Sequence, residues 1–305
     1  MRLKPLFPYI LILALFAIKI SCDNGEKVNY IDPEIVLSKH PNDIYLRENI
    51  LKEYGTAIRW RLDQKYLSKG QTADSIHENL VIPVTKLVEN LWIEPFILLS
   101  IHSEKFIREH MPKELLYLGS YIYNGNGDTI QGYAESGARI SLMNLNSYDL
   151  EDRLWLDDVL INMHHEFSHI VYQNHGLPEE YDQISSDGYL GEGWKKGVSL
   201  SDAIIRGMVS AYGTKNQYED FAELTSRYLV LDSTYFNSTF LKDSECDLFS
   251  EPDSCKRINK GRELIRQKLS LIRKYYFEKF ELDIDDLRDT IQKRMPVSKD
   301  VINQP

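Results

Sequence analysis

Apolar residues recur at two spacings along the chain, one typical of strands and one typical of helices. Short runs with alternating apolar residues predict three strands, at residues 56–61, 114–123 and 138–145. Apolar residues three and four apart predict helices at residues 85–100, 152–174, 201–211, 261–279 and 284–294. The mixture predicts an α+β fold in which a mixed sheet packs against the helix at 152–174, with additional helices at the carboxyl end.

The amino terminus has the pattern of a signal peptide. A positively charged start precedes an apolar run at residues 6–18, which is too short to span a bilayer comfortably. Residues 1–21 are therefore predicted as a signal peptide. The small residue before Cys22 favours lipoprotein processing, after which Cys22 would carry the lipid (palmitate). Lys19 fits such a processing site poorly, so an ordinary secretory signal stays open as the alternative.

The organisation changes after Cys22. Residues 22–43 are polar and contain two prolines, which predicts a tether. The acidic stretch 23–26 resembles the surface-export signal of Bacteroidota lipoproteins, so we expect an outer-membrane lipoprotein that is surface-exposed or faces the periplasm. Residues 44–305 contain no linker or repeat and predict one domain, with a helical extension from about residue 259. No later segment suits a transmembrane helix, so we expect membrane contact only through the lipid anchor.

The charge balance excludes one class of partner. The formal net charge is −10, and it becomes −13 without residues 1–21, which carry three cations and no acid. No basic run appears, so we expect no nucleic-acid partner and no electrostatic docking to anionic lipid.

Two further cysteines flank a turn-rich loop. Cys246 and Cys255 can form a disulfide in an exported chain, and free thiols are the alternative. Their spacing does not suit a zinc pair, and no other cysteine exists to complete such a site.

The predicted helix at 152–174 contains an HExxH stretch, His165-Glu166-Phe167-Ser168-His169. Residues four apart lie on one face of a helix, one turn above the other, so both imidazoles can reach one Zn²⁺. Glu166 would project beside the metal, where it can take a proton from a water molecule. An accidental match on a core helix is the alternative, although buried polar groups are costly unless they are paired.

A catalytic zinc usually has three protein ligands, and two other histidines are weak candidates for the third. His175 lies ten residues after His165, but Tyr172 stands where a helix-breaking glycine would be needed. The helix should therefore continue, and His175 should face away. His164 points about 100° from its neighbour His165, so we expect it to pack in the core or to support a ligand.

A second helical segment offers carboxylates instead. Apolar residues at helical spacing surround Glu219 and Glu223, which are four apart and therefore on one face. Paired carboxylates on a helix usually face solvent. Opposite an HExxH helix, one can bind zinc while the other accepts a hydrogen bond from a ligand imidazole.

Together these motifs carry a family resemblance. HExxH followed by E-x-F-A-E resembles the gluzincin arrangement, and residues 212–223 are similar to the catalytic end of the anthrax lethal factor group of zinc peptidases. Residues 130–230 resemble the substrate import-associated zinc metallohydrolase lipoproteins of the Bacteroidota. The resemblance implies a zincin-like domain with one Zn²⁺ per chain. It implies a metal site of His165, His169 and Glu219, supported by Glu223, with Tyr212 stabilising the oxyanion or assisting the leaving group.

The resemblance also implies an activity. We expect a zinc metallopeptidase that hydrolyses amide bonds of a peptide or protein substrate at the cell surface, with Glu166 as the general base. Nutrient import through a TonB-dependent importer complex is the implied setting. In zincins the strand before the HExxH helix is the sheet edge that pairs with substrate, which by analogy would be residues 138–145, with an ordinary interior strand as the alternative. A substrate-binding lipoprotein with little or no hydrolysis is the alternative, and a deamidating or deacylating hydrolase is also open.

Overall fold

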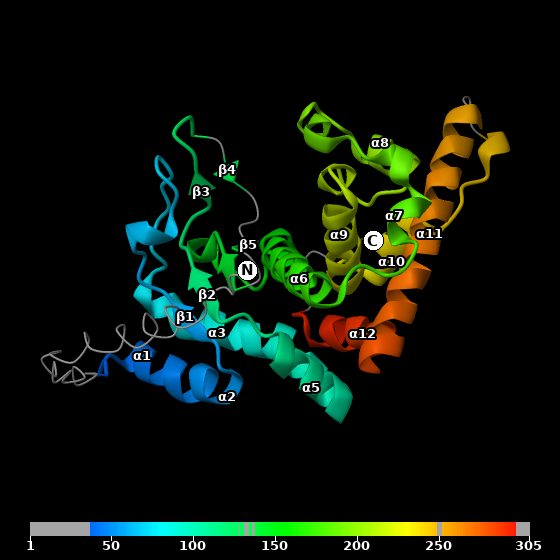
Figure 1. Ribbon diagram of the computed structural model, residues 1–305. Coiled ribbons are helices and arrows are strands. Elements are labelled where there is room, and N and C mark those ends of the chain that lie inside the picture. Colours follow the sequence, from blue (N-terminus) through cyan, green and yellow to red (C-terminus); the bar gives the residue numbers. More distant parts are fainter. Residues whose placement is uncertain (1–36, 128, 131–133, 136–137, 249–251, 297–305) are drawn as a thin grey trace, which may run out of the picture. The chain divides into compact units, whose positions relative to one another are not determined.

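The computed structural model describes residues 37–127, 129–130, 134–135, 138–248 and 252–296 (Figure 1). The predicted signal peptide, Cys22 and the predicted tether as far as residue 36 lie outside the described residues. Residues Met1–Ser38 and Lys39–Pro305 are separate units, and the helices and strands belong to the second. Within the described part of the chain, no helix has both the length and the apolarity needed to cross a membrane.

The main sheet is small and mostly parallel. Its strands lie in the order β1 (Ala57–Arg59), β2 (Glu114–Tyr117), β6 (Arg139–Leu142) and β5 (Ala134–Glu135). β1, β2 and β6 are parallel, and β5 pairs antiparallel with β6, with Glu135 opposite Arg139. β3 (Ile122–Tyr123) and β4 (Thr129–Ile130) form a separate antiparallel pair. The strand predicted at 56–61 is confirmed as β1.

Two other predicted strands differ from the structure. Segment 114–123 is interrupted after Tyr117 and resumes as β3. A Cβ atom at Gly119 would come within 2.3 Å of the Ser75 carbonyl oxygen, so two chain segments pass here only because the residue is glycine. Segment 138–145 is not the sheet edge, because β6 has β2 on one side and β5 on the other. Among the described strands, that edge is β5.

One interrupted helix precedes β1 and another follows it. α1 (Pro41–Leu46) passes through a wider π turn into α2 (Lys52–Tyr54), and α3 (Val81–Val88) passes through η4 (Glu89–Ile93) into α4 (Glu94–Leu99). The helix predicted at 85–100 therefore starts four residues earlier. Pro83 is tolerated because it lies in the first turn, where the backbone N–H has no helical acceptor. α5 (Ile101–His110) follows.

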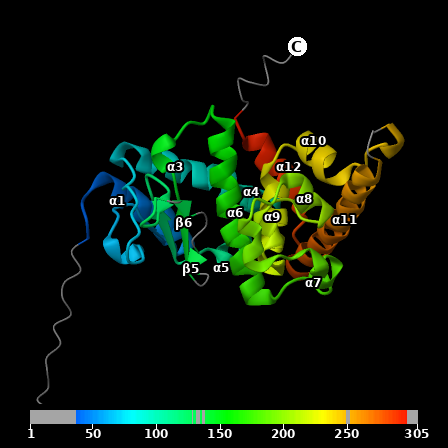
Figure 2. The same cartoon turned by 90° about the horizontal axis from the view of Figure 1, so that it is seen from above.

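The helix that carries the HExxH stretch is α6 (Arg153–His175). It lies between the sheet and helices α9 to α12 in both views (Figures 1 and 2). The Asp152 carboxylate caps its start by accepting hydrogen bonds from the N–H groups of Leu154 and Trp155. Gly176 follows its last residue. The helix predicted at 152–174 is thus confirmed.

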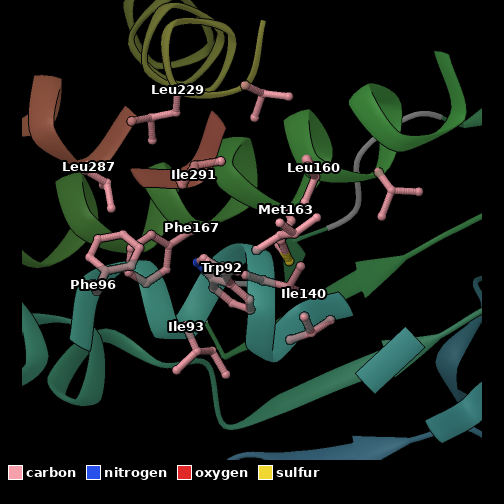
Figure 3. Close-up of a cluster of buried hydrophobic side chains, with 14 of the residues drawn as sticks. Trp92, Ile93, Phe96, Ile140, Leu160, Met163, Phe167, Leu229, Leu287 and Ile291 are labelled. Carbon is pink, nitrogen blue, oxygen red and sulfur yellow. The ribbon is translucent and has the colours of Figure 1, made fainter. Parts of the chain in front are cut away.

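Aromatic side chains fix α6 against the amino-terminal helices (Figure 3). The Phe167 ring meets those of Trp92, Phe96 and Phe106 edge-on, at centroid distances of 5.4, 5.9 and 5.8 Å. Such contacts add about 0.5–1.5 kcal/mol each to the burial of apolar area. Phe167 occupies the first x position of the HExxH stretch. The helix turn that carries the two histidines is therefore also packed into the hydrophobic core.

The carboxyl half is helical. Its helices are α7 (Tyr181–Ile184), α8 (Leu200–Ile205), α9 (Gln217–Val230), α10 (Ser233–Phe236), α11 (Pro252–Phe280) and α12 (Ile284–Arg294). The helix predicted at 201–211 ends early, because Gly207 takes a positive φ of 84° just after α8. α11 begins nine residues before the prediction at 261–279, and α12 matches the prediction at 284–294.

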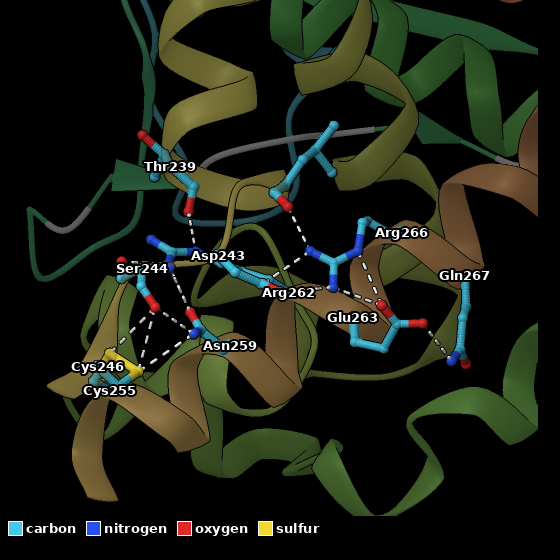
Figure 4. Close-up of polar contacts among 11 residues, drawn as sticks. Thr239, Asp243, Ser244, Cys246, Cys255, Asn259, Arg262, Glu263, Arg266 and Gln267 are labelled. Atoms are coloured by element: carbon cyan, nitrogen blue, oxygen red, sulfur yellow. Dashed lines mark hydrogen bonds and ion pairs between the residues drawn. A yellow bond between two sulfur atoms is a disulfide. The ribbon is translucent and has the colours of Figure 1, made fainter. Parts of the chain in front are cut away.

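A disulfide joins Cys246 to Cys255 in the first turn of α11, with an S–S distance of 2.02 Å (Figure 4). Beside it, Asn259 donates to the Ser244 carbonyl oxygen at 2.9 Å, and Arg262 donates to the Ser244 hydroxyl at 2.9 Å. The loop before α11 is therefore tied to that helix both covalently and by hydrogen bonds. The disulfide alternative is the one that the structure contains.

A buried ion pair joins α9 to α11. Lys268 Nζ donates to Asp220 Oδ2 at 2.6 Å and to the Ser185 hydroxyl at 3.0 Å, while the Tyr189 hydroxyl donates to Asp220 at 3.0 Å. Both charged side chains are excluded from solvent (0% and 1% exposed). Burial raises the pKa of Asp220 and lowers the pKa of Lys268, and each charge opposes the shift of the other.

Two histidines meet where α5 and α6 end. His110 Nδ1 lies 2.8 Å from the Phe106 carbonyl oxygen, which can only accept, so this nitrogen carries the proton. His110 Nε2 then accepts a hydrogen bond from His175 Nε2, at 2.7 Å. Burial lowers the pKa of both imidazoles. Lys279 of α11 contacts the carboxyl end of α6, where it donates a hydrogen bond to the His175 carbonyl oxygen at 2.9 Å.

We predict that Lys268→Met lowers the free energy of unfolding by about 3–5 kcal/mol, because it leaves a buried carboxylate without its cation. The double variant Lys268→Met/Asp220→Asn should recover most of this loss. Urea unfolding of the metal-free protein measures both. Lys274→Met is the control on the same helix, since that side chain is exposed, and it should change stability by less than about 0.5 kcal/mol. Equal losses for Lys268→Met and Lys274→Met would contradict the prediction.

We also predict that the protein loses stability as the pH falls below about 6.5. The unfolded chain then protonates its histidines, while the folded chain holds the pKa of His110 and His175 lower, so the unfolded state binds more protons. The free energy of unfolding of His110→Gln/His175→Gln should depend less steeply on pH between 7 and 5. His77→Gln, at an exposed position, should keep the wild-type slope. The same slope in all three proteins would refute this explanation.

Candidate metal centre

Helices α6 and α9 pack side by side and bring three predicted residues together. His165 and His169 lie one turn apart on α6, and their Nε2 atoms are 3.1 Å apart. Oε2 of Glu219, on the first turn of α9, lies 3.3 Å from His165 Nε2 and 3.2 Å from His169 Nε2. These three atoms form a nearly equilateral triangle that could hold one metal ion.

The size of this triangle fits zinc. Ligands about 2.0–2.1 Å from a tetrahedral ion lie about 3.3–3.4 Å from one another, close to the separations found here. Oε2 of Glu219 is buried, and among the described residues it has no hydrogen-bond donor in bonding geometry. Such an oxygen is costly to bury unless a cation compensates it. The donor set of two imidazoles and one carboxylate is one that zinc commonly takes.

Glu223 fixes the orientation of His165. Its Oε1 lies 2.9 Å from His165 Nδ1 as an ion-pair contact, and its Oε2 accepts a hydrogen bond from Arg227 Nε, also at 2.9 Å. A metal bound at Nε2, the atom that faces Glu219 and His169, requires the remaining ring proton to lie on Nδ1, and a carboxylate beside Nδ1 favours that form. Glu223 therefore selects the tautomer that can bind a metal.

The first turn of α9 positions Glu219. The Asn216 side chain caps the helix by accepting hydrogen bonds from the N–H groups of Tyr218 and Glu219, at 2.9 and 3.0 Å. The positive end of the helix dipole also favours a carboxylate here. Oε1 of Glu219 accepts hydrogen bonds from the Tyr212 hydroxyl at 2.8 Å and from Lys215 Nζ at 2.9 Å.

Opposing effects set the pKa values of these groups. Burial alone would lower the pKa of His165, but Glu219 and Glu223 raise it to about 10. Burial alone would raise the pKa of both carboxyls. Glu219 is nevertheless held well below its ordinary pKa by the two histidines and Lys215, and Glu223 is held below its own by Arg227 and His165. Both carboxylates are therefore charged at neutral pH.

Glu166 lies among these groups but in a different environment. Its side chain is buried, and burial raises its pKa, an effect that the neighbouring histidines partly oppose. A carboxyl with a raised pKa is a better proton acceptor than an ordinary one, which suits a general base. Position and environment are thus consistent with the predicted role.

Tyr212, which donates to Oε1 of Glu219, lies in the short turn η8 (Tyr212–Thr214). Trp194, from the turn η7 (Gly191–Lys195), lies edge-on to its ring at 4.8 Å. Burial, then the charge of Glu219, raises the pKa of Tyr212, so its hydroxyl keeps its proton. A cavity of about 110 Å³ lies beside His165 and Tyr212 and is also lined by Tyr121 and Asp158.

The other histidines lie elsewhere. His175 is the last residue of α6 and contacts His110 rather than the three ligand atoms. Tyr172 continues the helix, as predicted. His164 is 1% exposed, neither of its nitrogens has a hydrogen-bond partner among the described residues, and burial lowers its pKa to about 3. It is a neutral packing residue.

Two cations at this site were not predicted from the sequence. Lys215 contacts Glu219, and Arg227 contacts Glu223, each across four residues. The spacing was present in the sequence as two Lys/Arg–Glu pairs at helical intervals. Such pairs are common on exposed helices, so the spacing alone did not place them at the site.

Comparison with known proteins agrees with this geometry. No curated protein matches the chain. A crystal structure described as "a putative zinc-binding metallo-peptidase from Bacteroides caccae ATCC 43185" is 25% identical and covers 83% of this chain and 91% of its own, with a TM-score of 0.65. The predicted α+β, zincin-like metallopeptidase fold is thereby confirmed. A family model described as "Putative zinc-binding metallo-peptidase" matches residues 37–285, so the chain belongs to that family.

Proposed function

We propose that the protein is a zinc-dependent peptidase that hydrolyses amide bonds, with one Zn²⁺ held by His165, His169 and Glu219. The observation that carries this proposal is the triangle of ligand atoms, with sides of 3.1, 3.2 and 3.3 Å. Its size matches the spacing that a tetrahedral zinc requires. The family supports zinc-binding metallopeptidase chemistry in general, and the side chains around the triangle supply the other groups that amide hydrolysis needs.

Each of these groups has a distinct task. Zinc bound at the triangle would polarise the scissile carbonyl and lower the pKa of a water molecule. Glu166 takes a proton from the attacking water and passes it to the leaving nitrogen. Tyr212 keeps its proton and can turn from Glu219 to donate to the developing oxyanion, a contact typically worth about 2.7–4 kcal/mol. Glu223 holds His165 in the tautomer that binds the metal.

We propose the cell surface as the place of action. The support is the signal-peptide pattern of residues 1–21, the position of Cys22 for lipid attachment and the acidic stretch after it. A lipid anchor in the outer membrane would leave the folded unit free to meet peptide or protein substrates beside an importer. Radiolabelled palmitate incorporation, compared between wild type and Cys22→Ala, tests the anchor. Co-purification with a TonB-dependent importer tests the partner.

We predict one zinc per chain in the purified folded protein, and loss of zinc in Glu219→Ala. Removal of one of three ligands should weaken binding by more than the roughly 10–100-fold typical of outer-shell partners. Metal analysis after dialysis measures the content. His175→Ala is the control on the same helix and should keep its zinc. Zinc kept by Glu219→Ala and lost by His175→Ala would disprove the assignment, and a zinc-free wild type would favour the substrate-binding alternative.

We predict that Glu166→Gln keeps its zinc but lowers kcat by about 10²–10⁴-fold, because a general base contributes about that much. Release of fluorescent fragments from labelled casein by equal amounts of zinc-loaded protein measures turnover. Glu179→Gln, at an exposed position, should cleave like the wild type. Substantial turnover by a pure sample of Glu166→Gln would exclude this residue as the base.

A further inference from the structure

Four charged residues follow one another at intervals of four along α9 and the turn before it. They are Lys215, Glu219, Glu223 and Arg227, and their spacing places them along one side of the helix. Each carboxylate is paired with the cation on its outer side: Lys215 with Glu219 at 2.9 Å, and Arg227 with Glu223 at 2.9 Å. The two acids therefore face the histidines while the two cations hold them from either end.

The two oxygens of Glu219 have different surroundings. Oε2 faces the Nε2 atoms of His165 and His169, at 3.3 and 3.2 Å. Oε1 accepts hydrogen bonds from the Tyr212 hydroxyl at 2.8 Å and from Lys215 Nζ at 2.9 Å. Lys215 also donates to the Tyr212 hydroxyl, at 3.2 Å. Oε1 is thus occupied by two donors, whereas Oε2 is directed at the predicted metal position.

We propose that Lys215 is a positioning residue of the metal centre: by holding Oε1 of Glu219, it presents Oε2 alone to the metal. The inference rests on the proposed function, since it assigns a role toward the zinc proposed there. A carboxylate can bind a cation through one oxygen or through both. A charged donor on Oε1 favours binding through Oε2 alone, because Oε1 would have to give up a charge-assisted hydrogen bond to approach the metal.

The positive charge of Lys215 also reduces the repulsion among the carboxylates of the site. Glu166, Glu219 and Glu223 are all buried, and the charges of Glu219 and Glu223 act on Glu166. Like charges repel more strongly in the interior than in water. Lys215 compensates Glu219, the carboxylate that contacts both histidines. The Lys215 side chain is 28% exposed, so a substitution there should not create a buried cavity.

The test is the zinc dissociation constant of the whole folded protein, measured by competition with a chromophoric chelator. Lys215→Met should bind zinc about 10–100-fold more weakly than the wild type, the loss typical of an outer-shell partner. Lys215→Arg, which keeps a charged donor, should recover most of this affinity. Lys105→Met is the matched control, because Lys105 forms a Lys–Glu pair of the same spacing with Glu109 on an exposed part of α5. Its zinc affinity should be that of the wild type.

A second readout reports the coordination itself. In the cobalt-loaded protein, Lys215→Met should absorb visible light less strongly than the wild type, because release of Oε1 adds a ligand to a tetrahedral ion. Lys215→Gln, which keeps an amide donor, replaces Lys215→Met if that variant does not fold, and should show an intermediate loss of zinc affinity.

The outcomes separate this inference from the proposed function. A wild type that binds zinc while Lys215→Met binds it equally well, with an unchanged cobalt spectrum, would overturn the role of Lys215 and leave the proposed function standing. A wild type that binds no zinc would overturn both.

Discussion

The contact between α6 and α9 is the constraint on which the whole site depends. The histidines come from one helix and Glu219 from the other, and the ligand atoms must meet within a few tenths of an ångström. Each helix is therefore fixed on its far side. Phe167 anchors α6 among aromatic rings, and Asp220, directly after Glu219, anchors α9 to α11 through Lys268. On each helix, a residue of the site is followed directly by a residue that holds the helix in place: Phe167 after Glu166, and Asp220 after Glu219.

The site gathers an unusual amount of charge into the interior, and nearly all of it is compensated locally. Arg227 compensates Glu223, and Lys215 compensates one oxygen of Glu219. The other oxygen of Glu219 faces two imidazoles and has no donor in bonding geometry among the described residues. Because an uncompensated buried oxygen is unfavourable, a cation that binds there stabilises the fold as well as completing the site.

Local patterns predicted the elements that carry the site, and distant contacts account for the errors. Periodicity located α6, β1 and α12 to within a few residues, because their apolar faces repeat over several turns or positions. It missed the break at Gly119, which exists because another segment of chain passes there. The zincin analogy made β6 an edge strand, and nothing in residues 138–145 shows that β5 returns to pair with them. Pairing of this kind is a property of the whole chain.

The same distinction explains what was found and missed at the metal centre. The HExxH spacing of His165 with His169 indicated a metal site, and only beside it did the common spacing of Glu219 with Glu223 indicate a ligand and its support. Lys215 and Glu219 have the same spacing as Lys105 and Glu109, which form an exposed pair. Water screens the exposed pair, so it contributes little. Beside buried histidines the same pair acts in a lower dielectric, where it can decide which oxygen faces a metal. Tertiary burial, rather than spacing, turns a common helix pair into part of a metal centre.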